Sequence, residues 1–214
     1  MKEYHKIQTV YKRDPATKHK TLIEGDFSLS EFEFLQSNKW IFTEKVDGTN
    51  VRVIFDGETI RFGGKTDRAQ IPTLLMNCLN EKFLPKLDVF KEIFNGNHVC
   101  LYGEGYGAKI QSGGGKYRQD PDFVLFDVKI DEWWLQQHDV EDIAEKLEID
   151  TVPIIGTGTL REMVEMAKSG FKSRWGDFTA EGIVAKPAVE LKSRNEERII
   201  TKIKYKDFNS MPLS

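Results

Sequence analysis

Two short runs rich in β-branched and aromatic residues predict a β-hairpin in the first third of the chain. The runs are Thr49–Phe55 and Glu58–Phe62, and they are separated by Asp56-Gly57, a pair common in two-residue hairpin turns. Strands that are adjacent in sequence and joined by so short a turn pair antiparallel. The hairpin therefore favours antiparallel sheets and argues against an all-parallel doubly wound sheet.

Three other segments have the spacing of amphipathic helices, which makes the predicted fold class α+β, with antiparallel sheets flanked by helices. Apolar residues recur at helical intervals over residues 72–94, and Pro85 is expected to divide that stretch. A Thr-x-x-Glu capping box at residues 159–162 begins a second helix, which Gly170 ends. A shorter helix is expected over residues 139–147. All three are interpreted as scaffold.

The residues just before the hairpin place a lysine between two carboxylates. The segment is Thr43-Glu44-Lys45-Val46-Asp47-Gly48-Thr49-Asn50. A lysine amine attacks phosphorus when it is unprotonated and when a metal ion neutralises the phosphates. The segment therefore indicates a covalent nucleotidyltransferase lysine. Taken alone it has an alternative interpretation, a β-turn at Asp47-Gly48 with Lys45 in solvent.

Four further segments follow Lys45 in order along the chain, and together they favour the nucleotidyltransferase lysine over the β-turn. They are Leu101-Tyr102-Gly103-Glu104-Gly105-Tyr106-Gly107, Phe123-Val124-Leu125-Phe126-Asp127-Val128, Glu181-Gly182-Ile183-Val184-Ala185-Lys186-Pro187 and Ile200-Thr201-Lys202-Ile203-Lys204. In the last one the strand period sends Lys202 and Lys204 to one face, together with Arg198. Two lysines side by side on a strand suit a triphosphate or a pyrophosphate leaving group.

The chemistry of nucleotidyl transfer assigns a role to most of these charged residues. Lys45 attacks the α-phosphorus of a nucleoside triphosphate and becomes a phosphoramidate. Lys202, Lys204 and Lys186 can supply positive charge to the phosphates. Glu181 is the best candidate to hold a metal ion or its waters, because Mg²⁺ prefers few carboxylates together with substrate oxygens.

Two residues are candidates for contacts with the nucleoside. Glu104 lies at a strand end flanked by glycines, where a ligand can approach closely, and it could accept hydrogen bonds from ribose hydroxyls. Phe126 can supply an aromatic face for adenine. Considered singly, Glu104 and Glu181 are better explained as surface carboxylates at strand ends, but considered together they favour the functional interpretation.

Length and composition are those of a globular protein. The chain has 214 residues, with 39% apolar and 30% charged residues, and no apolar run approaches the roughly 18 residues of a membrane span. The first residues lead into no apolar signal core, so the expected compartment is the cytosol, including that of a bacterium or a phage-infected host. Cys78 and Cys100 lack metal or disulfide spacing, which fits a reducing compartment. The four histidines are scattered.

The net charge of −3 argues against a protein that coats nucleic acid through a basic surface. Contacts with nucleic acid must then be local. The C-terminal tract is the richest in basic residues, although a mixed solvated surface is an alternative interpretation of it as a whole. Five basic residues elsewhere are expected to line a path for a strand: Arg52, Lys65, Arg68, Lys116 and Arg118.

Together the five segments resemble the ATP-dependent RNA ligases of the second phage type. These belong to the covalent nucleotidyltransferase superfamily, which also contains DNA ligases and mRNA capping enzymes, and the likeness extends from about Lys6 to Phe208. The resemblance implies the ligase–capping enzyme nucleotidyltransferase fold, with a nucleotide cleft between its sheets. It also implies ATP and Mg²⁺ or Mn²⁺ as cofactors, and RNA ends or a nicked RNA duplex as substrate in RNA repair.

The resemblance carries over residue by residue. Lys45 matches the nucleophile, Asp47 its acidic neighbour, and Asn50 an asparagine near the phosphates. Glu44 looks like the residue that meets the adenine amino group. Glu104, Phe126, Glu181, Lys186, Lys202 and Lys204 match the remaining motifs. Lys65-Thr66 falls where the family places Arg-Thr, and lysine keeps the charge but loses the bidentate fork, so contact there should be weaker or differently aimed.

Residues 1–214 are expected to form a single nucleotidyltransferase domain. Few residues follow Lys204, so the sequence predicts neither a C-terminal OB domain nor the helical domain of the second-type phage RNA ligases. Three interpretations stay open: a compact ligase, a truncated form of a longer protein, or a subunit in which a partner protein or domain replaces the missing part. Complete ligation is accordingly less secure than self-adenylylation.

Three functional classes follow. The wording of the motifs favours an ATP-dependent RNA ligase that forms lysyl-AMP, transfers AMP to an RNA 5′-phosphate and seals it to a 3′-hydroxyl. The alternatives are a DNA ligase or capping guanylyltransferase core, and a nucleotide-binding module without catalysis. A non-catalytic module would be expected to lose Lys45 first, and Lys45 is present.

Overall fold

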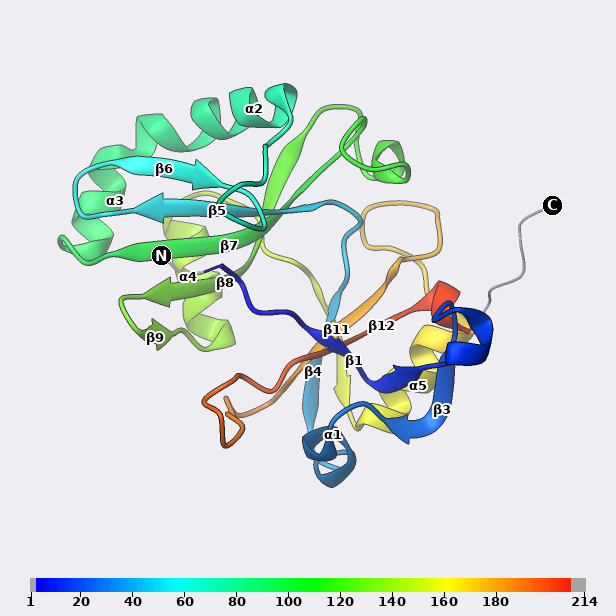
Figure 1. Ribbon diagram of the computed structural model, residues 1–214. Coiled ribbons are helices and arrows are strands. Elements are labelled where there is room, and N and C mark those ends of the chain that lie inside the picture. Colours follow the sequence, from blue (N-terminus) through cyan, green and yellow to red (C-terminus); the bar gives the residue numbers. More distant parts are fainter. Residues whose placement is uncertain (1–2, 209–214) are drawn as a thin grey trace. The chain divides into compact units, whose positions relative to one another are not determined.

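The computed structural model describes residues 3–208, which divide into two compact units (Figure 1). Unit 1 contains Asp47–Val152 and the N-terminal residues up to His5, and unit 2 contains Lys6–Val46 and the segment from Pro153 onward. Each unit is built on a five-stranded sheet. The single domain over residues 1–214 stays a prediction, and residues 1–2 and 209–214 lie outside the described residues.

Unit 1 contains the predicted hairpin as two strands of an antiparallel sheet. Its strands, in the order β6-β5-β7-β8-β9, are Ile60–Gly63, Thr49–Phe55, Val99–Tyr106, Asp122–Ile130 and Trp133–Trp134. The hairpin prediction is confirmed, with Phe55 opposite Ile60. Asp56 closes the turn by accepting hydrogen bonds from the N–H groups of Thr59 and Glu58, and these bonds lower the pKa of Asp56 to about 2.

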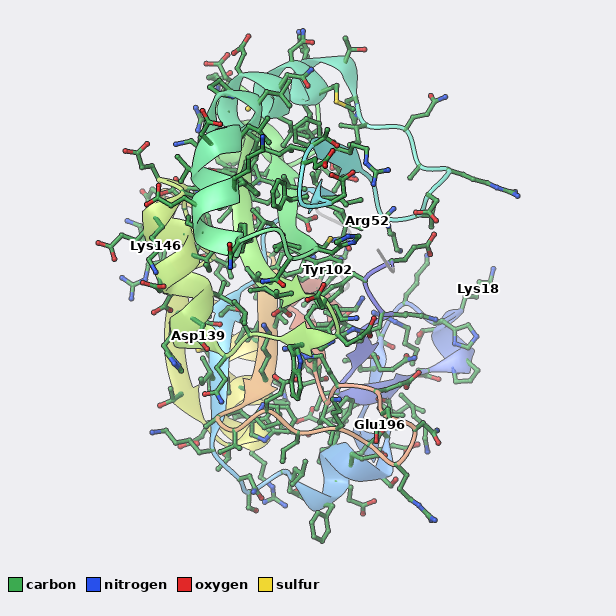
Figure 2. All side chains as sticks on the ribbon, turned by 90° about the vertical axis from the view of Figure 1, so that its left-hand side faces the viewer. Lys18, Arg52, Tyr102, Asp139, Lys146 and Glu196 are labelled. Atoms are coloured by element: carbon green, nitrogen blue, oxygen red, sulfur yellow. The ribbon has the colours of Figure 1, made fainter. Side chains whose placement is uncertain are left out.

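Helices cover one face of the unit 1 sheet. They are α2 (Thr73–Phe83), the 3₁₀ turn η2 (Leu84–Lys86), α3 (Leu87–Phe94) and α4 (Gln137–Lys146). The predicted break at Pro85 is confirmed, because the proline lies in the turn between α2 and α3. Apolar residues of these helices and of alternate strand positions form one buried cluster. The charged residues Asp139 and Lys146 lie at the two ends of α4 (Figure 2).

Unit 2 has its own sheet, in the order β1-β12-β11-β4-β10. The strands are Gln8–Thr9, Thr201–Lys204, Gly182–Pro187, Trp40–Glu44 and Ile154–Gly158. All neighbours pair antiparallel except β1 and β12, which are parallel. A small second sheet pairs β2 (Tyr11–Arg13) with β3 (Leu22–Phe27). The antiparallel sheets of the predicted α+β class are thus confirmed in both units.

Helix α5 (Leu160–Ser169) packs against β11 and β12 of the unit 2 sheet. The predicted capping box is present, because the hydroxyl of Thr159 accepts from the N–H of Glu162 while the carboxylate of Glu162 accepts from the N–H of Thr159. Gly170 ends the helix with φ of 75°, as predicted. Alternate residues of the strands and one side of α5 form the second buried cluster, which includes Trp40, Phe42, Ile183 and Met163. The remaining short elements are α1 (Ser30–Phe34), η1 (Pro15–Thr17), η3 (Gly114–Lys116) and η4 (Tyr205–Asp207).

Candidate active site

The two faces of the unit 2 sheet differ sharply in chemistry. Ile183 pairs with Ile203 of β12 and with Glu44 of β4, and this face packs on the buried cluster under α5. Residues that are opposite each other on neighbouring strands share a face, and successive residues alternate. Lys202 and Lys204 pair with Val184 and Gly182, so they lie on the other face. The predicted alternation of lysines along β12 is confirmed.

Four lysines gather on this second face, which we call the lysine face: Lys45, Lys186, Lys202 and Lys204. Lys186 is there because it is two residues beyond Val184 on β11. Lys45 follows the last residue of β4, and its N–H continues the pairing by donating to the carbonyl of Gly182 at 2.9 Å. All four lysines are half-buried. The strands therefore hold the predicted nucleophile on the same face as three further lysines.

Glu181 joins two of these lysines. Its Oε2 is 2.6 Å from the Nζ of Lys45, and its Oε1 is 2.5 Å from the Nζ of Lys204. The side chain of Glu181 is only 13% exposed, so both ion pairs are shielded from solvent. The nucleophile and the predicted metal ligand thus lie in direct contact, although 136 residues separate them.

The two lysines set the charge of Glu181. Burial alone raises the pKa of this carboxyl, but the charge of Lys45 and the hydrogen bonds from Lys204 and Lys45 outweigh burial. The net result is a pKa of Glu181 below its ordinary value. The two lysines therefore favour the ionised form of Glu181.

We expect low pH to destabilise the unaltered chain more than a Glu181→Gln variant. Because the pKa of Glu181 is lower in the folded than in the unfolded chain, its stabilisation is complete above the unfolded pKa and is lost as pH falls through the folded pKa. The measurement is urea unfolding of both proteins at about pH 7 and about pH 3. An equal loss of unfolding free energy in the two proteins would contradict the assignment.

Gly182, the residue after Glu181, allows β11 and β12 to approach closely at this point. A Cβ atom on Gly182 would lie 2.1 Å from the carbonyl oxygen of Ile203 and 2.7 Å from the Cα of Lys204. Any side chain at position 182 would therefore push Lys204 away from Glu181. The close approach of the two strands therefore explains why a glycine follows Glu181 in the motif.

Gly182→Ala is expected to lower the free energy of unfolding by about 1–3 kcal/mol or more, the usual cost of overpacking. The matched control is Gly156→Ala in β10 of the same sheet, where the nearest atom to an added Cβ is a ring carbon of Phe42 at 3.6 Å. Denaturant unfolding compares the two variants. If both lose the same stability, the close approach at Gly182 is not the reason for the glycine.

Glu44 lies on the opposite face from Lys45. Its side chain is 1% exposed, and both of its oxygens accept hydrogen bonds, from the Ser173 hydroxyl at 2.6 Å and from the Arg174 N–H at 2.8 Å. Burial raises the pKa of Glu44, and these two bonds partly oppose that rise. Neither Ser173 nor Arg174 was indicated by the sequence, because neither belongs to a recognisable motif.

The remaining predicted residues belong to unit 1. Asn50 on β5 is opposite Glu104 on β7, and its amide donates to the Glu104 carboxylate at 2.8 Å. The Asp47 N–H donates to the Tyr117 hydroxyl at 3.2 Å. The structure therefore brings Asn50 and Glu104 together on the face of the sheet that the helices do not cover. Their roles, like that of Asp47, stay predictions.

Phe126 and Lys65 have different surroundings in unit 1. Phe126 on β8 lies edge-on to the ring of Tyr4, at 5.2 Å between centroids, and Tyr4 donates a hydrogen bond of 2.7 Å to Asp127. Lys65 is exposed in the loop after β6. The contacts of Tyr4 with Phe126 and Asp127 were not predicted from the sequence, because a lone tyrosine near a terminus belongs to no motif.

The expectation that Arg52 lines a nucleic-acid path is wrong. Its side chain is only 3% exposed, donates to the Gly64 carbonyl at 2.9 Å and pairs with Asp67 at 2.7 Å. Arg52 on β5 is opposite Tyr102 on β7, and both are labelled in Figure 2. Arg118 pairs with Asp122. Lys65, Arg68 and Lys116 remain exposed.

Neither a metal cage nor a membrane helix is found in the described chain. Within residues 3–208, no group of three or more histidine, cysteine, aspartate or glutamate side chains is arranged to hold a metal ion. No helix among these residues is long and apolar enough to cross a membrane.

The family model for RNA ligases matches residues 38–206, so the chain belongs to the RNA ligase family. This confirms the resemblance seen in the motifs. The matched range contains all of the predicted site residues. A search of functionally curated proteins gave no match.

Solved structures of an RNA ligase from Naegleria gruberi have the same fold. One, a lysine-to-alanine mutant with ATP and Mn, is 16% identical, with a TM-score of 0.68 over 95% of this chain and 56% of that chain. Another, with PPi, is 17% identical, with a TM-score of 0.67 over 97% of this chain and 59% of that chain. The nucleotidyltransferase fold of RNA ligases is thereby confirmed. The chain spans a little over half the length of these structures.

Proposed function

We propose that this chain is the nucleotidyltransferase part of an ATP-dependent RNA ligase, with Lys45 as the residue that becomes adenylylated. The observation that carries the proposal is the contact of Lys45 with Glu181, which also contacts Lys204, on a face with two more lysines. Membership of the RNA ligase family supports the choice of reaction. The N. gruberi structures with ATP and Mn support ATP and a divalent cation as cofactors.

In the first step, the Nζ of Lys45 attacks the α-phosphorus of ATP. A P–N bond forms, the bond to the β-phosphate oxygen breaks, and pyrophosphate leaves. Attack requires the free amine, so the ammonium group of Lys45 must lose a proton before transfer. Lys186, Lys202 and Lys204 are the cations available to take up the charge that develops on the leaving pyrophosphate.

Glu181 is the side chain that we propose for the metal ion. Its carboxylate already holds two cationic groups, and a single carboxylate suits Mg²⁺ or Mn²⁺ when phosphate oxygens complete the coordination. The bound cation would supply charge neutralisation for the phosphates. Following the family resemblance, we propose that Glu104 contacts the ribose, Phe126 the adenine and Asn50 the phosphates. Asp47 is proposed as the acidic neighbour of Lys45, and Lys65 as a contact to the nucleotide.

Two transfers complete the proposed reaction. The 5′-phosphate oxygen of an RNA end attacks the phosphorus held on Lys45, so that the P–N bond breaks and a phosphoanhydride forms. The 3′-hydroxyl of the neighbouring end then attacks the 5′-phosphate, forming a phosphodiester and releasing AMP. The substrate is proposed to be RNA ends or a nicked RNA duplex.

Incubation with radiolabelled ATP or GTP and Mg²⁺ tests the proposed activity. Covalent label from ATP is expected, in an adduct that is stable to alkali and labile to acid, as a phosphoramidate is. Label from GTP alone would instead indicate a capping guanylyltransferase. Label from neither would leave a nucleotide-binding module and overturn the proposal.

The RNA substrate leads to a further expected result. Because the chain has a net charge of −3, binding of a strand should be weak and should weaken further with salt. Sealing should therefore be slower than self-adenylylation, and faster with pre-adenylylated RNA ends than with ATP and a plain 5′-phosphate. Matched RNA and DNA nicks at one salt concentration provide the test. Faster sealing of DNA would refute RNA as the substrate but not the transfer to Lys45.

A further inference from the structure

Glu44 and Lys45 are neighbours in sequence whose side chains serve opposite faces of one sheet. Glu44 pairs with Ile183 on the face that packs under α5, whereas Lys45 reaches Glu181 on the lysine face. A nucleotide that meets Lys45 is on the lysine face. Glu44 is 1% exposed on the opposite face, where each carboxylate oxygen already accepts a hydrogen bond, so its side chain does not reach an adenine amino group on the lysine face.

The carboxylate of Glu44 holds another segment of unit 2. Oε1 accepts from the hydroxyl of Ser173 and Oε2 accepts from the N–H of Arg174. The oxygen of Ser173 in turn accepts from the N–H of Trp175 at 3.1 Å. Two successive residues, Ser173 and Arg174, are thus bonded directly to the buried carboxylate, and Trp175 is linked to it through the Ser173 hydroxyl. Hydrogen bonds to a carboxylate are among the stronger ones in proteins.

These residues belong to a hairpin that leads directly into Glu181. The N–H of Ser173 donates to the Phe178 carbonyl and the N–H of Ala180 donates to the Phe171 carbonyl, both at 2.9 Å. Lys172 and Thr179 form a bridge between the two arms. The hairpin, drawn in gold just before β11 in Figure 1, ends at Ala180, one residue before Glu181. Fixing the hairpin therefore also fixes the backbone position of Glu181, the residue that follows it.

We propose that Glu44 and Ser173 are positioning residues for the adenylylation of Lys45. The pair anchors the hairpin Phe171–Ala180 to the end of β4, so that Lys45 and Glu181, each one residue beyond the anchored segments, face each other on the lysine face. This role rests on the proposed function, and it replaces recognition of the adenine amino group as the task of the Glu44 side chain. Neither the motifs nor the RNA ligase family match singles out Ser173.

The test compares single-turnover labelling by ATP in four variants with the unaltered chain. Glu44→Ala should lower the rate at saturating ATP on the order of 10²-fold, the effect of a misplaced reacting group, and Ser173→Ala about tenfold. Glu44→Gln should lose only a few-fold, because its amide can still accept from the Arg174 N–H and contact Ser173. Glu44→Ala with Ser173→Ala should be no slower than Glu44→Ala alone, since both changes break one network.

Two readouts separate positioning from general destabilisation and from base recognition. The concentration of ATP at half-maximal rate should stay within a few-fold, and the preference for ATP over inosine triphosphate, which lacks the amino group, should be unchanged. The control is Ser28→Ala, which removes a serine hydroxyl donating to the Thr9 carbonyl in the same unit. It should label at the normal rate, with all assays run well below the melting temperature of every variant.

Two results would overturn the inference while leaving the proposed function in place. Loss of the preference for ATP in Glu44→Ala, with Ser173→Ala fully active and selective, would show that Glu44 reads the base. Multiplicative effects in the double variant would show that the two residues act separately. Absence of label in the unaltered chain would instead refute the proposed function itself.

Discussion

Replacing Lys45 with alanine is expected to abolish covalent labelling of the chain by ATP. Lys45 is the lysine of the Glu-Lys-Val-Asp-Gly motif, whereas Lys186, Lys202 and Lys204 of the lysine face are assigned to the charge on the leaving pyrophosphate. The side chain of Lys45 is 20% exposed and fills no apolar core, so its removal should leave the fold intact. Gel autoradiography after incubation with labelled ATP and Mg²⁺ measures the adduct.

Lys39→Ala is the matched control for this experiment. Lys39 is an exposed lysine that directly precedes β4, the strand that ends before Lys45. Its variant should label like the unaltered chain, and circular dichroism should show that both variants fold. An acid-labile adduct at normal yield in Lys45→Ala would mean that the nucleophile is another residue.

Glu181→Ala and Lys204→Ala are each expected to slow self-adenylylation by on the order of 10² or more. This is the usual cost of removing a group that stabilises developing charge. Glu181 would be lost both as the partner of Lys45 and as the proposed metal ligand, and Lys204 as a cation beside the leaving group. Lys202→Ala is expected to have a similar effect, because Lys202 is on the same face of β12.

Single-turnover labelling over a range of Mg²⁺ concentrations measures these effects and divides them. Glu181→Ala should require more Mg²⁺ for its half-maximal rate, whereas Lys204→Ala should not. The matched control is Glu24→Ala, which breaks the exposed ion pair between Glu24 and Lys168 in the same unit. If all three site variants stay within a few-fold of the unaltered chain, the charge on the phosphates is managed by other residues.

Local sequence patterns predicted those parts of the structure that depend on neighbouring residues. The hairpin at Asp56-Gly57, the break at Pro85 and the capping box at Thr159 each follow from the chemistry of a few adjacent positions. The face of Lys202 and Lys204 likewise follows from alternation along one strand.

Contacts across the sheet were beyond such patterns. Whether Glu44 faces the core depends on its pairing with Ile183, about 140 residues later, and a register shift of one residue would reverse it. Arg52 was expected to line a nucleic-acid path because it is one of the local basic residues, but its side chain is only 3% exposed and bonds to Asp67 and the Gly64 carbonyl. Ser173 was missed because its role depends wholly on Glu44 lying beside it.

The strand order of unit 2 has a consequence for the time at which this protein becomes active during synthesis. Its sheet draws strands from residues 8–9, 40–44, 154–158, 182–187 and 201–204, and β12 lies between β1 and β11. The long segment Asp47–Val152 can collapse as the ribosome releases it, because its core cluster lies within that segment. Lys45 must instead wait for β12, so a nascent chain acquires its charged face only when almost all of the described residues have emerged.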